Sequence, residues 1–76
     1  MSPKLPRITT RQLLRALSRD GWEQVRQRGS HVQLKHATKP GLVTVPQHVG
    51  AIVKPHILES VLEQAGLSAA DLTRLL

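Results

Sequence analysis

The chain has 76 residues, of which 11 are Lys or Arg and 5 are Asp or Glu, so its formal net charge is +6. This length allows one domain over residues 1–76, with a single modest core. Cysteine is absent, which excludes a disulfide framework, a cysteine-based zinc site and thiol chemistry. One Trp and no Phe or Tyr argue against RNA-binding modules that stack successive bases on exposed rings.

The positive charge is concentrated in the first part of the chain. Residues 1–54 hold ten basic and two acidic side chains, whereas residues 55–76 hold one basic and three acidic ones. A polyanion such as nucleic acid is the natural partner of the first part, and the alternative is charge that only favours solubility. No apolar run has the length of a membrane span or of a signal peptide, so we expect a cytoplasmic protein.

The N-terminal part predicts an extended arm and then an amphipathic helix. Residues 1–7 contain two prolines and are expected to form the arm. Thr9 is a suitable N-cap with Gln12 completing a capping box, which predicts a helix over residues 10–19, and Gly21 suits the positive φ that follows a helix. The polar face of this helix is either solvated or follows phosphates. It carries Arg11, Arg15 and Arg19.

The central part changes its apolar period from 3.6 to 2, as expected for strands. Three short strands in an antiparallel meander are predicted over residues 22–27, 31–35 and 42–45. Turns are expected around Gly29 and Gly41, so that Lys39 is interpreted as a turn charge. Trp22 is predicted to fill the core beneath the first helix.

The C-terminal part predicts two further helices. Pro55 fits the first position of a helix that Gly66 ends, and Ser68 with Asp71 forms a capping box for a short final helix. The order is therefore α-β-β-β-α plus a short C-terminal helix. Because both main helices must bury their leucines on the same sheet face, the fold class is α+β, a two-layer sandwich.

Strand parity places one histidine where chemistry is feasible. Val32 and Leu34 must point toward the helices, so His31, which alternates with them, points to the open face of the sheet. A neutral imidazole can act as a general base near neutral pH. RNA carries its own nucleophile, the ribose 2′-OH, so a histidine aided by cations can cleave RNA without a metal. A lone exposed histidine is equally compatible with no chemistry.

Three further side chains have two interpretations each, and a fourth has one. Arg28 and Lys35 lie near His31 in sequence and either hold phosphate or are solvated. His48, in the loop after the third strand, is either a substrate contact or a surface residue. His36 has the parity of the buried residues and is interpreted as a histidine at the edge of the core.

The histidine pattern does not predict a metal centre. His56, near a helix N-terminus, is interpreted as a surface residue. The spacing of the four histidines matches no ligand motif, so no metal and no other cofactor is expected.

Several motifs, taken in order, resemble the HicA toxin family of small mRNA interferases. They are Gly29-Ser30-His31, Val45-Pro46-Gln47-His48 and Gln64-Ala65-Gly66-Leu67, within a resemblance that extends from about Leu5 to Leu76. The resemblance implies a double-stranded-RNA-binding-domain-like fold, endonucleolytic cleavage of mRNA, and His31 as the catalytic residue. We interpret Gly29 and Ser30 first as turn residues and then, with Arg28, Lys35 and His48, as RNA contacts. The pair Pro55-His56 departs from the family, which often has Gly-Thr or a similar pair there.

The resemblance also implies partners. A HicB-type antitoxin binds toxins of this family and masks the active site, and the complex represses its own operon through the antitoxin. Direct DNA binding by this chain alone is therefore not expected. The residues leave two alternatives open, a non-catalytic module that binds double-stranded RNA and a protein whose open sheet face or strand edge accepts a partner.

Overall fold

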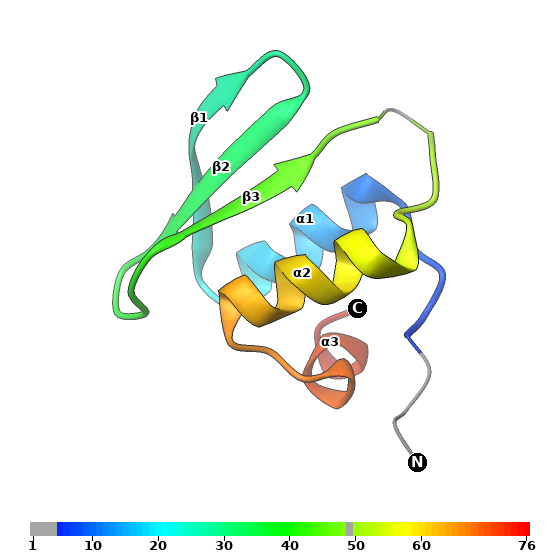
Figure 1. Ribbon diagram of the computed structural model, residues 1–76. Coiled ribbons are helices and arrows are strands. Elements are labelled where there is room, and N and C mark those ends of the chain that lie inside the picture. Colours follow the sequence, from blue (N-terminus) through cyan, green and yellow to red (C-terminus); the bar gives the residue numbers. More distant parts are fainter. Residues whose placement is uncertain (1–4, 49) are drawn as a thin grey trace.

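The computed structural model describes residues 5–48 and 50–76, so residues 1–4 of the predicted arm lie outside the described residues. The element order is α-β-β-β-α-α, and the three strands form one antiparallel sheet in the order β1-β2-β3 (Figure 1). The elements are α1 (Thr10–Arg19), β1 (Trp22–Arg28), β2 (His31–His36), β3 (Leu42–Pro46), α2 (Pro55–Ala65) and α3 (Ala69–Leu75).

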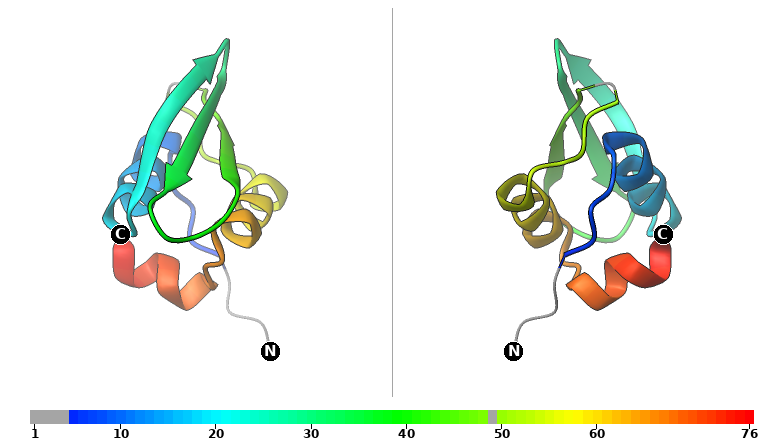
Figure 2. Two further views of the ribbon diagram at one scale, coloured as in Figure 1. Left: turned by 90° about the vertical axis from the view of Figure 1, so that its left-hand side faces the viewer. Right: turned by 90° about the vertical axis from the view of Figure 1, so that its right-hand side faces the viewer.

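The layers match the predicted α+β sandwich, whose architecture resembles a double-stranded-RNA-binding domain. Figures 1 and 2 show α1 and α2 together on one side of the sheet, with α3 beneath them and away from the strands. The predicted strands are confirmed, each extended by one residue at its C-terminal end. No helix of the described residues covers the opposite face of the sheet, which we call the open face (Figures 1 and 2).

Local signals set the helix boundaries, as predicted. The Thr9 side chain accepts a hydrogen bond from the Gln12 backbone N–H at 3.2 Å, and the Gln12 side chain accepts one from the Thr9 N–H at 2.8 Å. Helix α2 begins at Pro55 and ends at Gly66, whose φ of 68° is left-handed. The second capping box, at the start of α3, is also confirmed.

The core lies between the sheet and the helices. Val32 and Leu34 on β2 face α1 and α2, and Trp22 is 1% exposed, which confirms the predicted orientation of both strands. The other buried apolar residues come from α1, β3, α2 and α3 and from the segments that precede α1 and α2. They are Ile8, Leu13, Ala16, Leu17, Val43, Val45, Val53, Leu58, Val61, Leu62, Ala65 and Leu72.

One backbone donor on the outer edge of β3 is bonded to a side chain of α2. The Thr44 backbone N–H donates a hydrogen bond to the Gln64 side-chain oxygen at 2.9 Å. The amide nitrogen of Gln64 donates in turn to the Ser60 hydroxyl at 3.2 Å, which fixes the orientation of the amide. A side chain of α2 thus occupies a backbone donor of the edge strand.

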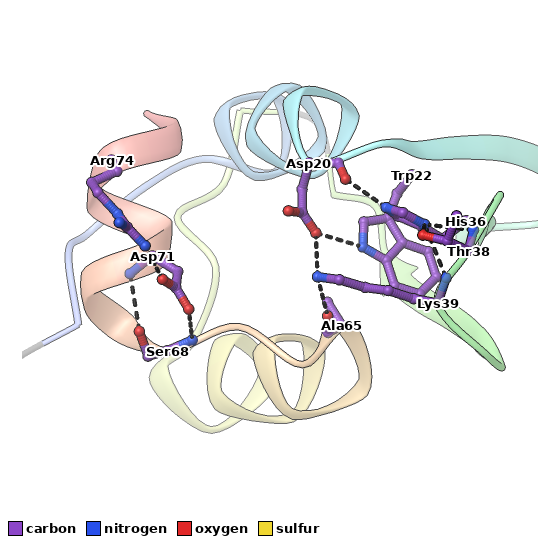
Figure 3. A network of polar contacts seen from close by, with 9 residues as sticks. All are labelled: Asp20, Trp22, His36, Thr38, Lys39, Ala65, Ser68, Asp71 and Arg74. Atoms are coloured by element: carbon purple, nitrogen blue, oxygen red, sulfur yellow. Dashed lines mark hydrogen bonds and ion pairs between the residues drawn. The ribbon is translucent and has the colours of Figure 1, made fainter.

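A network around Asp20 fastens the C-terminal ends of α1 and α2 to the β2–β3 turn (Figure 3). The Asp20 carboxylate accepts from the Lys39 ammonium at 2.6 Å and from the Trp22 indole N–H at 3.2 Å. Lys39 also donates to the Ala65 carbonyl at 3.1 Å. Lys39 is therefore a charge in the turn, as predicted, and it also links two helix ends that the fold brings to this turn.

His36 belongs to the same network and confirms its prediction as a histidine at the edge of the core. Its Nε2 lies 2.6 Å from the Asp20 carbonyl oxygen, and its Nδ1 accepts from the backbone N–H groups of Thr38 and Lys39 at 3.0 and 3.1 Å. This pattern requires a neutral ring with the proton on Nε2. The ring also meets Trp22 edge-on, with centroids 5.2 Å apart.

Candidate active site on the open sheet face

His31 begins β2 and is exposed on the face of the sheet opposite α1 and α2. Residues directly opposite one another in an antiparallel pair share a face, so the strand register defines three rows on this face. The first row is Arg28–His31–Pro46, the second is Arg26–Gln33–Thr44, and the third is Glu23–Lys35–Leu42. The His31 ring makes no hydrogen bond to any residue that the structure describes, and it is free to meet a ligand.

The turn between β1 and β2 fixes the position of His31. Gly29 has a φ of 55° while Ser30 has a negative φ, the pattern of a two-residue hairpin turn with glycine first. The Ser30 carbonyl accepts from the Gln47 N–H at 2.5 Å, which ties the turn to the end of β3. In the structure, Gly29 and Ser30 therefore shape the hairpin that presents His31.

A β-bulge at Val25 determines on which face of the sheet the arginine side chains of β1 lie. Gln24 pairs with Leu34 and Arg26 pairs with Gln33, so Val25 is an extra residue in the ladder. With simple alternation from the buried Trp22, both Arg26 and Arg28 would point toward the helices. The bulge reverses the parity and brings both guanidinium groups to the face of His31.

Arg26 is a site residue that the sequence reasoning missed. It is exposed, one row from His31, and no ion pair joins it to another described residue. The acidic residue of the three rows, Glu23, lies in the row farthest from His31. The surroundings of the imidazole are consequently cationic, as expected for a site that receives phosphate.

The remaining predicted site residues lie farther away. Lys35 is exposed on the same face, four residues along β2, which corresponds to roughly 13 Å. His48 is exposed two residues beyond the end of β3 and lines a hollow with the start of α1. Arg28 and His31 are thus brought together, whereas Lys35 and His48 flank them on different sides.

Residues 5–48 and 50–76 contain neither a metal-binding cluster nor a membrane-spanning helix. In these ranges no three His, Asp or Glu side chains lie close enough together to hold a metal ion. Nor does any helix within them have both the length and the apolar character needed to cross a membrane.

Comparison with protein families supplies the identification. The model of the family described as HicA toxin of bacterial toxin-antitoxin matches residues 10–67, which is more than half of the chain. The chain belongs to the HicA toxin family. A search of curated proteins gave no match. Membership makes the chain the toxin of a toxin–antitoxin system and implies an antitoxin as its partner.

The matched span of this HicA toxin begins with α1, contains the whole sheet and ends just after α2. The departure at Pro55-His56 lies inside it, yet α2 starts regularly with proline at its first position. Helix α3 lies outside the span and packs on α1. Leu72 is fully buried there, and the Arg19 guanidinium donates to the Leu75 carbonyl at 2.8 Å.

Proposed function

We propose that this HicA toxin is a metal-independent endoribonuclease that cleaves mRNA with His31 as its catalytic residue. The observation that carries the proposal is the first row of the open face. It pairs an exposed histidine, free of protein partners among the described residues, with the guanidinium-bearing Arg28 directly opposite. When an internal hydroxyl attacks a phosphodiester, the reaction requires a general base and a cationic donor, and this row supplies both.

In the proposed reaction His31 removes the proton of a ribose 2′-OH, and the resulting oxygen attacks the adjacent phosphorus. The new O–P bond forms as the bond to the 5′-oxygen of the next nucleotide breaks. That leaving oxygen takes a proton from the imidazolium or from water. The products are a 2′,3′-cyclic phosphate and a 5′-hydroxyl end, so the reaction needs no metal, and DNA is spared because it lacks the 2′-OH.

The cations have separate roles in this proposal. Arg28 and Arg26 stabilise the negative charge that develops on the phosphate oxygens, because a guanidinium offers paired donors that match them. Lys35 meets a phosphate farther along the strand as a point charge. Gly29 and Ser30 contact RNA where the hairpin turn borders the scissile bond, and His48 does so beyond β3.

We infer that a HicB-type antitoxin neutralises the toxin in the cytoplasm, where mRNA lies, by covering the face of His31. A cationic face suits an acidic partner. The same face also carries Leu42, which is 49% exposed and offers apolar contact area. Such a cover would exclude RNA and inhibit the enzyme without any change in the fold.

A non-catalytic module that binds double-stranded RNA is the second candidate. The fold resembles a double-stranded-RNA-binding domain, and such domains recognise the shape and phosphates of a duplex. This candidate predicts affinity for duplex RNA with no cleavage and no dependence on His31.

The test compares His31→Ala with His56→Ala, a matched change of an exposed histidine on α2. Each protein is incubated with single-stranded RNA and EDTA, and each is induced in growing cells. We expect His31→Ala to lower the cleavage rate by roughly 100-fold or more and to abolish growth inhibition. We expect His56→Ala to act as the parent, and both variants to keep the parent's melting temperature. Undiminished cleavage or toxicity of His31→Ala would refute the proposal.

The same assay distinguishes a specific contribution of Arg28 and Arg26 to the cleavage rate from a general effect of positive charge. We expect Arg28→Ala and Arg26→Ala each to lower kcat by about tenfold, since a charged hydrogen bond to the transition state is lost. Arg7→Ala, an exposed change before α1, is the matched control and should retain the parent's rate.

A further inference from the structure

The hollow between the start of α1 and the loop after β3 has the chemistry of an anion site. It has a volume of about 340 Å³ and is lined by Thr9, Thr10, Arg11, Gln47, His48 and Gly50. A guanidinium, an imidazole, hydroxyls and an amide supply hydrogen-bond donors, and none of the lining residues is acidic. The described residues form two ion pairs, which involve Lys39 and Arg74, so the charge of Arg11 is uncompensated by them.

Thr10 is a second, independent indication of a ligand. The residue is 5% exposed, and its hydroxyl makes no hydrogen bond to another described residue. The side chain nevertheless lines the hollow, and no described buried polar atom is both sealed from solvent and unsatisfied. The hydroxyl is therefore accessible from one of the two hollows that Thr10 lines, and the hollow beside Arg11 is the one with mainly polar lining residues, where an incoming acceptor would satisfy it.

The fold holds the two walls of the hollow together and joins them to the candidate active site. The Val53 N–H donates to the Ile8 carbonyl at 2.8 Å, and Thr9 pairs with Ile52 as an isolated bridge. Figures 1 and 2 show the loop after β3 beside the start of α1. At the other end, Gln47 is bonded to the Ser30 carbonyl and directly follows Pro46, the register partner of His31.

We propose that this hollow binds the RNA phosphate next to the scissile one, with Arg11 and His48 as ligands and the Thr10 hydroxyl as a further donor. The inference rests on the proposed function, because it extends the path of the bound RNA from His31 across Pro46 to the hollow. It adds a positioning site on α1, outside the sheet face. An acidic segment of a protein partner is the competing occupant, and the experiment separates the two.

The test measures binding in a protein that cannot cleave. A fluorescently labelled single-stranded RNA of about ten nucleotides is titrated with the His31→Ala protein and with four double variants. Each double variant combines His31→Ala with one further change, namely Arg11→Ala, Arg11→Lys, Thr10→Val or Arg15→Ala. Arg15→Ala is the matched control, because Arg15 lies one helical turn further along α1 and outside this hollow. Melting temperatures confirm that each variant is folded.

We expect Arg11→Ala to weaken binding by about tenfold, as a charged hydrogen bond is lost. The slope of log affinity against log salt should fall by about 0.7, the value of one phosphate contact on a single strand. Arg11→Lys should restore most of the affinity, Thr10→Val should weaken binding by about threefold, and Arg15→Ala should change it by less than about twofold.

Two results would overturn the inference. One is unchanged RNA binding by Arg11→Ala, which together with weaker antitoxin binding would assign the hollow to the protein partner. The other is an equal loss for Arg11→Ala and Arg15→Ala, which would show a general effect of charge. Because binding is measured without cleavage, failure of the parent protein to cut RNA refutes the proposed function and leaves this result standing.

Discussion

The two ends of β2 carry the same residue type in opposite circumstances. His31, at the start of the strand, is exposed, and its ring has no hydrogen-bond partner among the described residues. His36, at the end, has both ring nitrogens hydrogen-bonded and makes an edge contact with Trp22. The difference teaches how to separate a structural histidine from one that is available for chemistry, because a ring with both nitrogens bonded to backbone groups has no nitrogen left to exchange a proton with a substrate.

We call the His36 end of β2, with the network around Asp20, the fixed end. The protein should lose stability when the packing there is disturbed, and Gly21→Ala disturbs it most directly. Gly21 has a φ of 104°, and a Cβ built there would lie 2.6 Å from the His36 Nε2. We expect the free energy of unfolding to fall by about 3 kcal/mol, from backbone strain and the displaced histidine. Urea unfolding followed by Trp22 fluorescence measures it.

Gly41→Ala is the matched control for that change. Its φ is 80°, but no described atom lies within 4 Å of the added Cβ. It should therefore cost only the strain, about 1 kcal/mol. Equal losses for the two variants would mean that the contact with His36 contributes nothing. Cleavage per folded molecule should be the same in both, since His31 lies at the other end of β2.

A smaller effect on stability is expected at Lys39, in the network around Asp20, and none at Lys35, on the open face. Lys39→Met removes the ion pair with Asp20, whose side chains are 34% and 21% exposed, so we expect a loss of about 0.5–1 kcal/mol. Lys35→Met should leave the melting temperature unchanged and weaken RNA binding instead. If Lys39→Met weakened RNA binding as much as Lys35→Met, the distinction between the open face of the sheet and the structural network around Asp20 would be wrong.

The smallest effect concerns α3, which borders the fixed end. The backbone N–H of Ser68, then its hydroxyl and the Arg74 guanidinium, hold the pKa of Asp71 below its usual value of 3.8. A carboxylate whose pKa is lowered by folding contributes stability above its unfolded pKa and loses it as the pH falls through the folded one. Asp71→Asn should therefore melt earlier than the parent near neutral pH, and the difference should shrink as the pH falls through the lowered pKa of Asp71 in the folded protein. A difference that persisted in acid would contradict this.

Most of the fold follows from local sequence signals. The capping pairs Thr9–Gln12 and Ser68–Asp71 and the glycine after α2 set helix ends that depend on a few neighbouring residues. Alternation in β2 placed His31 on the open face for the same reason, because one strand with one buried face determines its own parity.

The sequence could not predict what depends on how distant segments meet. The bulge at Val25 arises from the pairing of β1 with β2, and without it the parity of Arg26 cannot be derived. Lys39 was placed in a turn correctly, but its partners come from the ends of α1 and α2. The roles of His31 and of its neighbouring cations in catalysis stay predictions until the variants are measured.

The two edges of the sheet are both interrupted, which affects self-association of the protein. Unpaired strand edges are templates on which copies of a protein add to one another. Here Gln64 blocks a donor of the β3 edge, and the bulge at Val25 interrupts the β1 edge. A net charge of +6 adds repulsion between copies. The sheet thus keeps its open face available for ligands while offering little to another copy of itself.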